Sequence, residues 1–229
     1  MTFPNGAFHQ DGYTALTAAM TNVSTADIQV TSTSLFATAG HILIESELIA
    51  YTGKTSTTFT GITRGVYGTT NVSHSIGADV TEALGVASST SSTSVPFDTT
   101  DASNNVSVNA LDNSKIEFAV AGYYNIQFSA QLLNFTTSDD NVTLWFKQNG
   151  TDVPFSAGIQ AVSSKHGSSP GAGIVSWNIV LSVAAGDYIQ LYYASESGNT
   201  VVATYPAGVA PVHPVSPSMI LTATFVSSL

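Results

Sequence analysis

The chain has 229 residues, of which 43% are hydrophobic and only 9% are charged, and 15 acidic against 5 basic residues give a net charge of −10. Binding to nucleic acid or to an anionic membrane surface requires a stripe of basic side chains, so this composition argues against both classes of partner. The absence of cysteine excludes disulfides, thiolate metal sites and cysteine nucleophiles.

The low charge also bears on assembly. Charged side chains are one means by which proteins keep sheet edges from pairing with other chains. Because this chain has few of them, we expect its sheet edges to be closed by assembly into an oligomer.

The N-terminus and the apolar runs predict where the protein is made. Residues 1–6 contain no basic segment followed by an apolar stretch, so we expect no signal peptide. No apolar run approaches the ~18 residues that a membrane span requires. We therefore expect a soluble protein that is made in a cytoplasm and binds no membrane.

The N-terminal part begins with a polar arm. Asp11 stands where it would cap a short helix over residues 13–20, whose apolar residues share one face. Short strands with turn signals between them are predicted next. They cover residues 27–30, 41–51, 57–62 and 78–81.

A change of composition divides the chain. Residues 88–94 are all Ser or Thr, lack periodicity and offer little to bury, which is typical of a linker. The sequence therefore predicts an N-terminal attachment module over residues 1–84, a Ser/Thr-rich linker over 85–103 and a C-terminal domain over 104–229.

The C-terminal domain reads as an antiparallel sandwich. Its predicted strands cover residues 115–120, 123–133, 142–148, 174–183, 188–194 and 219–226. Asn149-Gly150 is the strongest hairpin signal, and the proline-rich segment 206–217 is expected to be a surface loop because proline removes ladder donors. Strands with turns between them and no long helical period predict an all-β fold.

Four segments of this domain occur in a familiar order. They are FAVAGYYNIQFS at 118–129, WFKQNG at 145–150, LSVAAGDYIQL at 181–191 and the closing strand at 219–225. Over residues 105–229 the chain resembles the jelly-roll heads of the tumour-necrosis-factor and complement globular-head families. The resemblance implies a jelly roll that assembles as a homotrimer and binds partners without catalysis. The loops differ, so no ligand surface is transferred.

A second pattern lies in the N-terminal part. Residues 44–53 (IESELIAYTG) and 58–65 (TFTGITRG) are followed by GTT at 68–70, then His74, Gly77 and Ala78. This run resembles a small β module that recurs in phage virion proteins. The resemblance implies attachment to a particle or display on it, again without chemistry.

Two patterns suggest chemistry and are assigned to structure instead. Residues 167–171 spell G-x-S-x-G, but a nucleophile elbow needs a helix directly after the serine, and Pro170 stands there. We predict a surface loop. The acidic run 138–141 offers oxygen ligands for calcium, yet too few for a complete site, so a solvated turn is expected.

The histidines do not have metal-site spacing. They are His9, His41, His74, His166 and His213. His74 is expected to be a hydrogen-bonded turn residue. Three copies of His213 around a trimer axis would offer an ion site, but nothing in the sequence requires one.

Glu45 and Glu47 are two residues apart, which on a strand places both on one face. A glycosidase needs its carboxylates opposed across the scissile bond, so we expect this pair to face water or to pair with Arg64. Arg64 is the only arginine, and its five donors suit it to hold turn carbonyls or a carboxylate.

Aromatic residues are frequent in the predicted C-terminal strands. They are Tyr123, Tyr124, Phe128, Trp145, Phe146, Trp177, Tyr188, Tyr192 and Tyr193. Alternation places half of them inside the sandwich. The outward ones are expected at a trimer interface, and a lectin groove is the alternative.

The sequence as a whole predicts a phage virion structural protein that is not an enzyme. We expect a trimeric capsid decoration protein, head fibre or knob, assembled in the host cytoplasm. Its partners would be its own copies and the major capsid protein or another virion protein, which the N-terminal module would contact. The alternatives are a tail-fibre tip that recognises host surface glycans and, less favoured, a polysaccharide hydrolase. No catalytic, cofactor-binding or metal-ligating residue is predicted.

Overall fold

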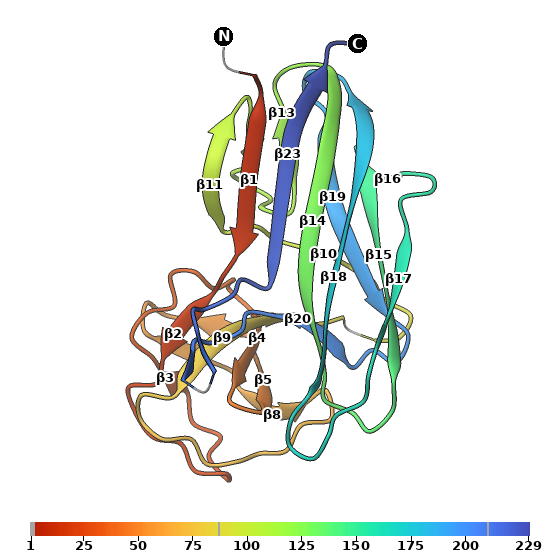
Figure 1. The fold of residues 1–229 in the computed structure, drawn as a ribbon. Helices are drawn as coiled ribbons and strands as arrows, with labels where there is room; N and C mark the ends of the chain where they lie inside the picture. Colours follow the sequence, from red (N-terminus) through yellow and green to blue (C-terminus); the bar gives the residue numbers. More distant parts are fainter. Residues whose placement is uncertain (1–2, 87, 210) are drawn as a thin grey trace.

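The computed structural model describes residues 3–86, 88–209 and 211–229, and every regular element in these ranges is a β-strand (Figure 1). All strand pairs are antiparallel. The predicted all-β class is confirmed. Within the described ranges, no helix has the length and apolarity to cross a membrane.

Two sheets face each other in the upper part of Figure 1 and have the arrangement of a β-sandwich. The first layer has the order β11-β1-β23-β14-β18. Its strands are β1 (Asn5–Gln10), β11 (Thr99–Asn104), β14 (Gly122–Asn134), β18 (Gly171–Val183) and β23 (Met219–Ser227).

The second layer has the order β12-β13-β19-β15, and β10 pairs with β19 while β16 and β17 pair with β15. Its strands are β10 (Thr93–Ser94), β12 (Val106–Val108), β13 (Ile116–Phe118), β15 (Asp140–Gln148), β16 (Thr151–Asp152), β17 (Gly158–Val162) and β19 (Tyr188–Ser195). Each strand predicted for this domain has its counterpart in one of the two layers.

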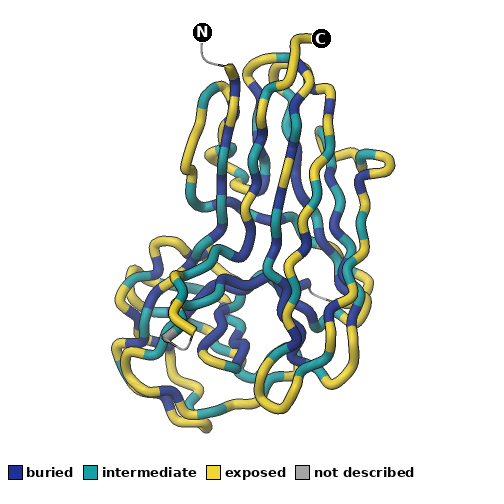
Figure 2. The backbone as a smooth tube through the Cα atoms, viewed as in Figure 1, coloured by how far each residue is buried: buried dark blue, intermediate teal, exposed yellow. Residues whose placement is uncertain are grey.

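The core of the sandwich is built from residues that alternate with outward-facing ones along much of the long strands. On β14, Tyr124, Ile126 and Phe128 are buried, and the residues between them face outward. They meet Leu144 and Phe146 of β15 in one apolar cluster. Figure 2 shows the same alternation of buried and exposed residues along the long strands. Successive side chains of a strand point to opposite faces, so the period-two pattern of the sequence indicates which residues of these strands are buried.

The predicted Asn149-Gly150 turn is tied to the turn between β18 and β19. Asn149 and Gly150 both have positive φ, as a two-residue hairpin turn requires. The Asp187 carboxylate accepts hydrogen bonds from the Ala184 N–H at 2.7 Å and from the side chains of Gln148 at 2.9 Å and Asn149 at 2.7 Å. These hydrogen bonds hold the pKa of Asp187 below its ordinary value.

The N-terminal part is a compact set of short strands. They are β2 (Tyr13–Ala15), β3 (Ile28–Gln29), β4 (Gly40–Ile44), β5 (Glu47–Tyr51), β6 (Gly53–Lys54), β7 (Thr58–Thr60), β8 (Thr63–Val66) and β9 (Asp79–Leu84). The helix predicted over residues 13–20 is wrong. Thr14 pairs with Val80 in a strand ladder, and the Leu16 N–H donates to the Ala78 carbonyl.

The strand predicted over residues 41–51 is two strands. β4 and β5 form a hairpin that reverses at Glu45, where φ is +55°. Ile42 and Ile44 enter one apolar cluster and Leu43 enters another, so both faces of the hairpin are buried. Burial on both faces removes the alternation that would have marked the turn.

The two parts of the chain share one sheet. β20 (Thr200–Ala203) pairs with the end of β14 on one side and with β9 on the other. A third apolar cluster, which includes Leu48, Leu133 and Val201, lies at this junction. The sheet is therefore continuous from the module into the sandwich.

Segments outside residues 104–229 also belong to the sandwich. β1 lies between β11 and β23, and Val95 and Phe97 are buried in the sandwich core. The three-part division of the chain stays a prediction, and these contacts show which strands each part contributes. Within the proline-rich segment 206–217, β21 (Gly208–Val209) and β22 (Val212–His213) form a short hairpin.

Candidate functional site

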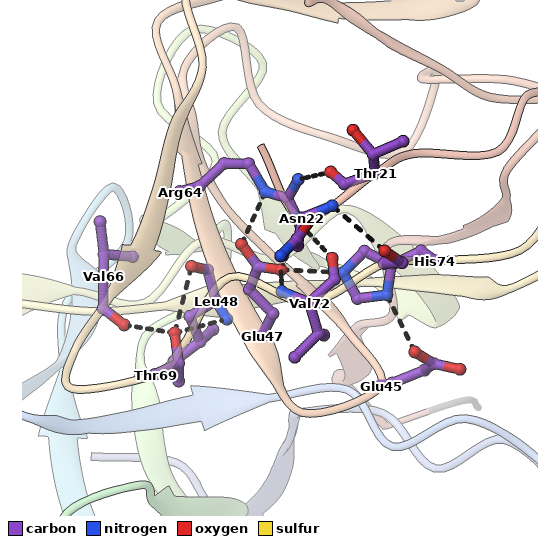
Figure 3. Close-up of polar contacts among 11 residues, drawn as sticks. Thr21, Asn22, Glu45, Glu47, Leu48, Arg64, Val66, Thr69, Val72 and His74 are labelled. Carbon is purple, nitrogen blue, oxygen red and sulfur yellow. Dashed lines mark hydrogen bonds and ion pairs between the residues drawn. The ribbon is translucent and has the colours of Figure 1, made fainter. Parts of the chain in front are cut away.

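A dense network of polar contacts lies in the N-terminal module (Figure 3). Glu47 on β5 faces Arg64 on β8. Arg64 Nε donates to Glu47 Oε1 at 2.8 Å, and Arg64 Nη2 donates to Glu47 Oε2 at 2.5 Å. The two side chains are 0% and 3% exposed, so this is a buried bidentate ion pair.

Two further groups complete the surroundings of Glu47. The Val72 N–H donates to Glu47 Oε2 at 3.0 Å, and His74 Nε2 lies 2.9 Å from the same oxygen. Burial by itself would raise the pKa of Glu47, but the hydrogen bonds from Arg64, Val72 and His74 outweigh it and hold the pKa below its ordinary value. The other ring nitrogen of His74 lies 2.9 Å from Glu45 Oε2.

The network holds three stretches of chain against the β4–β5 hairpin. Arg64 also donates to the Thr21 carbonyl at 2.5 Å and to the Val72 carbonyl at 2.6 Å. Thr69 Oγ1 donates to the Val66 carbonyl at 2.8 Å and accepts from the Leu48 N–H at 3.1 Å. The loop between β8 and β9 is thereby fixed at several points.

These contacts settle the sequence predictions for this region. Arg64 pairs with a carboxylate and turn carbonyls, and His74 is a hydrogen-bonded residue, both as predicted. The expectation that both glutamates share one face is wrong, because Glu45 lies in the hairpin turn and is 59% exposed while Glu47 is fully buried. Glu47 has hydrogen-bond partners on both oxygens and no solvent access, so it supports structure rather than chemistry.

The network also forms one wall of a cleft. Val72, whose N–H and carbonyl are both held by the ion pair, faces residues of the β17–β18 loop across a cavity of about 310 Å³. The cavity is lined by Ser46, Thr69, Thr70, Val72, Phe135, Lys165, Gly167 and Ser168. Module and sandwich thus both contribute to this concave surface.

The G-x-S-x-G segment lies at this cleft as a turn. His166 and Ser169 exchange two backbone hydrogen bonds, Gly167 has φ +63°, and β18 follows at Gly171. A strand stands where a nucleophile elbow requires a helix, so the predicted surface loop is confirmed.

The acidic run 138–141 divides between surface and interior. Asp140 is buried and accepts from Ser195 Oγ at 2.6 Å, Thr200 Oγ1 at 2.5 Å and the Ser197 N–H at 2.9 Å. Asp139 accepts from the Ser164 N–H at 2.8 Å. The solvated turn predicted here is wrong for Asp140, because its hydrogen bonds replace water and hold the end of β15 to β19. Across the described part of the chain, no three His, Cys, Asp or Glu side chains gather as metal ligands.

The aromatic residues divide as alternation predicted. Tyr124 is fully buried and Tyr123 is 43% exposed, while Tyr193 is fully buried beside the half-buried Tyr192. The ring of Trp145 lies beside that of Tyr192, with centroids 5.7 Å apart, on the outer face of the second layer.

One buried acidic group escaped the sequence analysis. Glu82 on β9 is 7% exposed, its Oε2 has no hydrogen-bond partner, and Asp98 lies against it at the junction of module and sandwich. Burial first, and then the charge of Asp98, raise the pKa of Glu82 to about 8. β9 has the sequence DVTEAL, with Asp79 as a second acidic residue, so the local pattern carries no signal that Glu82 is buried.

No protein-family model matches the chain, and no curated protein matches it.

Proposed function

We propose that this chain is a non-enzymatic phage virion protein, in which a trimeric jelly-roll sandwich is displayed on the particle and the N-terminal module makes the attachment. The role would be that of a capsid decoration protein, head fibre or knob. Four lines of observation support it: the strand order, the character of one sheet face, the polar interior, and the position and surface of the module.

The strand order supports a jelly roll. The five strands of eight or more residues alternate between the layers along the chain: β14 in the first, β15 in the second, β18 in the first, β19 in the second and β23 in the first. Two sheets linked by such crossing connections are the architecture of a jelly roll.

The trimer proposal rests on the outer face of the first layer. β14, β18 and β23 contain no charged residue, and β18 is an edge strand of 13 residues that pairs with β14 without a register shift. Ile174, Val180, Ile220 and Val226 are each at least 40% exposed on this face. A long, uncharged edge strand beside a sheet face with exposed aliphatic groups is a surface that other chains bind, and a closed ring of copies would cover it.

The polar interior supports a structural role. The buried carboxylates Glu47 and Asp140 each accept several hydrogen bonds from the protein itself. Carboxylates used in this way hold elements together and are not poised opposite one another across a groove, which a polysaccharide hydrolase would need.

The module supports attachment by its position and its surface. Apart from β1, which belongs to the sandwich, its strands lie at the end of the molecule opposite both described termini (Figure 1). Val23 and Ile76 are 79% and 66% exposed there, which gives the module apolar groups for contact with the major capsid protein or another virion protein. The continuous sheet would transmit this attachment rigidly to the sandwich.

The trimer is tested by placing a charge on the proposed interface. We expect the wild-type chain to sediment at equilibrium as three 23.7 kDa subunits. Val180→Lys should shift the distribution to monomers, because three like charges would be buried together. Ile159→Lys, a change at another exposed aliphatic residue on β17 of the second layer, should remain trimeric. A wild-type monomer at micromolar concentration would contradict the proposal.

A second candidate function is a tail-fibre tip that recognises host surface glycans. The cleft between module and sandwich favours it, because a concave site lined by hydroxyl-bearing residues suits a polyhydroxylated ligand. Both candidates use the same architecture and differ in the place of the chain on the particle.

A further inference from the structure

Lys165 differs from the other basic side chains of the described chain. Lys54 donates to main-chain carbonyls, Arg64 pairs with Glu47, and Lys115 and Lys147 lie 3.1 Å and 3.4 Å from aspartates. Among the lysine and arginine side chains of the described residues, only that of Lys165 makes no hydrogen bond or ion pair with a carboxylate or carbonyl, and Lys165 lines the cleft of about 310 Å³. In a chain of net charge −10, an unused cation in a concave site indicates an anionic ligand.

The other residues that line the cleft indicate which groups the ligand has besides its negative charge. Three hydroxyl-bearing residues, Ser46, Thr70 and Ser168, line the same cleft, and Thr70 and Ser168 are exposed. The Thr69 hydroxyl is already engaged with main-chain groups. Hydroxyl groups donate and accept hydrogen bonds, as the hydroxyls of a sugar do.

The cleft is held open by the fold on both sides. On the module side, Val72 is fixed at both main-chain groups by Glu47 and Arg64. On the sandwich side, the Lys165 N–H donates to the Thr136 carbonyl at 2.8 Å, and the next residues form a closed turn. Pre-formed walls lower the entropy that a ligand must lose on binding.

We propose that this cleft binds a carboxylate-bearing saccharide. The Lys165 ammonium would pair with the sugar carboxylate, and the Ser46, Thr70 and Ser168 hydroxyls would contact the ring hydroxyls. The inference deepens the glycan-recognition candidate by naming the ligand class and the residues, and it rests on that candidate.

Ligand-detected saturation-transfer NMR tests the site with the full-length protein. D-glucuronate and D-glucose are titrated directly at low salt, and inorganic phosphate, which has no carbon-bound proton to observe, is titrated as a competitor of glucuronate. We expect saturable binding of glucuronate that is tighter than that of glucose or phosphate. Lys165→Gln should weaken glucuronate binding about tenfold or more, which is the loss of one charge-assisted hydrogen bond. Lys115→Gln, at a lysine outside the cleft, should leave it unchanged.

Several results would overturn the proposal. If glucose binds as tightly as glucuronate, the carboxylate is not recognised. If phosphate binds as tightly, the sugar ring is not recognised. If Lys165→Gln binds glucuronate as the wild type does, or if no saturable binding is seen, the cleft is not the binding site. Sedimentation of the same Lys165→Gln sample separates these failures from failure of the trimer, because the variant should remain trimeric.

Discussion

Arg64→Met is expected to lower the free energy of unfolding by about 3–5 kcal/mol, since it leaves a buried carboxylate without its charge partner. Glu47 and Arg64 are 0% and 3% exposed, and the substitution also removes the donors to the Thr21 and Val72 carbonyls. Urea unfolding at pH 7 and equal protein concentration measures the loss.

Two further variants make that result specific. Lys115→Met, which breaks the exposed pair with Asp112, should leave the midpoint of unfolding nearly unchanged. Adding Glu47→Leu to Arg64→Met should recover part of the lost stability, because an apolar pair no longer leaves a buried charge. If Arg64→Met is as stable as Lys115→Met, the network does not hold the module.

The second large effect is on the pH dependence of stability. Burial, and then the charges of neighbouring carboxylates, raise the pKa of Glu82 to about 8 and that of Asp98 to about 6. The groups that face Glu82 are Asp98, Asp11, the Gln10 amide and the Tyr51 ring, and none of them is a cation.

The direction of the pH effect follows from linkage. Folding raises the pKa of the Glu82 carboxyl. Below its ordinary pKa of 4.5 the carboxyl is protonated in both the folded and the unfolded chain and does not change the free energy of unfolding. As the pH rises from 4.5 to the folded pKa of about 8, the unfolded chain loses this proton first and stability is lost. Each pKa unit corresponds to about 1.4 kcal/mol, so the loss between pH 5 and pH 9 should reach several kcal/mol. Glu47, whose pKa is lowered, has the opposite effect below pH 4.5.

Urea unfolding at pH 5, 7 and 9 tests this account. The wild-type protein should be most stable at pH 5, and Glu82→Gln should flatten the dependence and be the more stable protein at pH 9. Glu196→Gln, at an exposed glutamate, should follow the wild-type curve. A wild-type protein that gains stability between pH 5 and pH 9 would show that Glu82 is not held in a desolvated site.

The sequence predicted the parts of the fold whose pattern is local. β14 and β15 alternate clearly, and the Asn149-Gly150 turn has the conformation that its residue types favour. Arg64 could be assigned a structural role because a sole arginine near two glutamates has few other partners.

The remaining features depend on contacts between distant segments. β1 pairs with β11, about 90 residues later in the chain, so its place in the sandwich has no local signal. Leu16 and Met20 have the spacing of a helix face. In the structure both are buried, and their backbones form isolated β-bridges with Val30 and His74. Glu82 meets Asp98, and Lys165 meets the Thr70 loop, only after the module and sandwich pack together.

Cryo-electron microscopy of the intact phage particle tests the central proposal most directly, by locating this chain and counting its copies. The proposal predicts trimers at three-fold or quasi-three-fold positions of the head, with the N-terminal module against the shell and the sandwich projecting outward. A few copies at the tail would contradict head decoration in favour of the glycan-binding tip, and absence of the chain from the particle would contradict a virion role altogether.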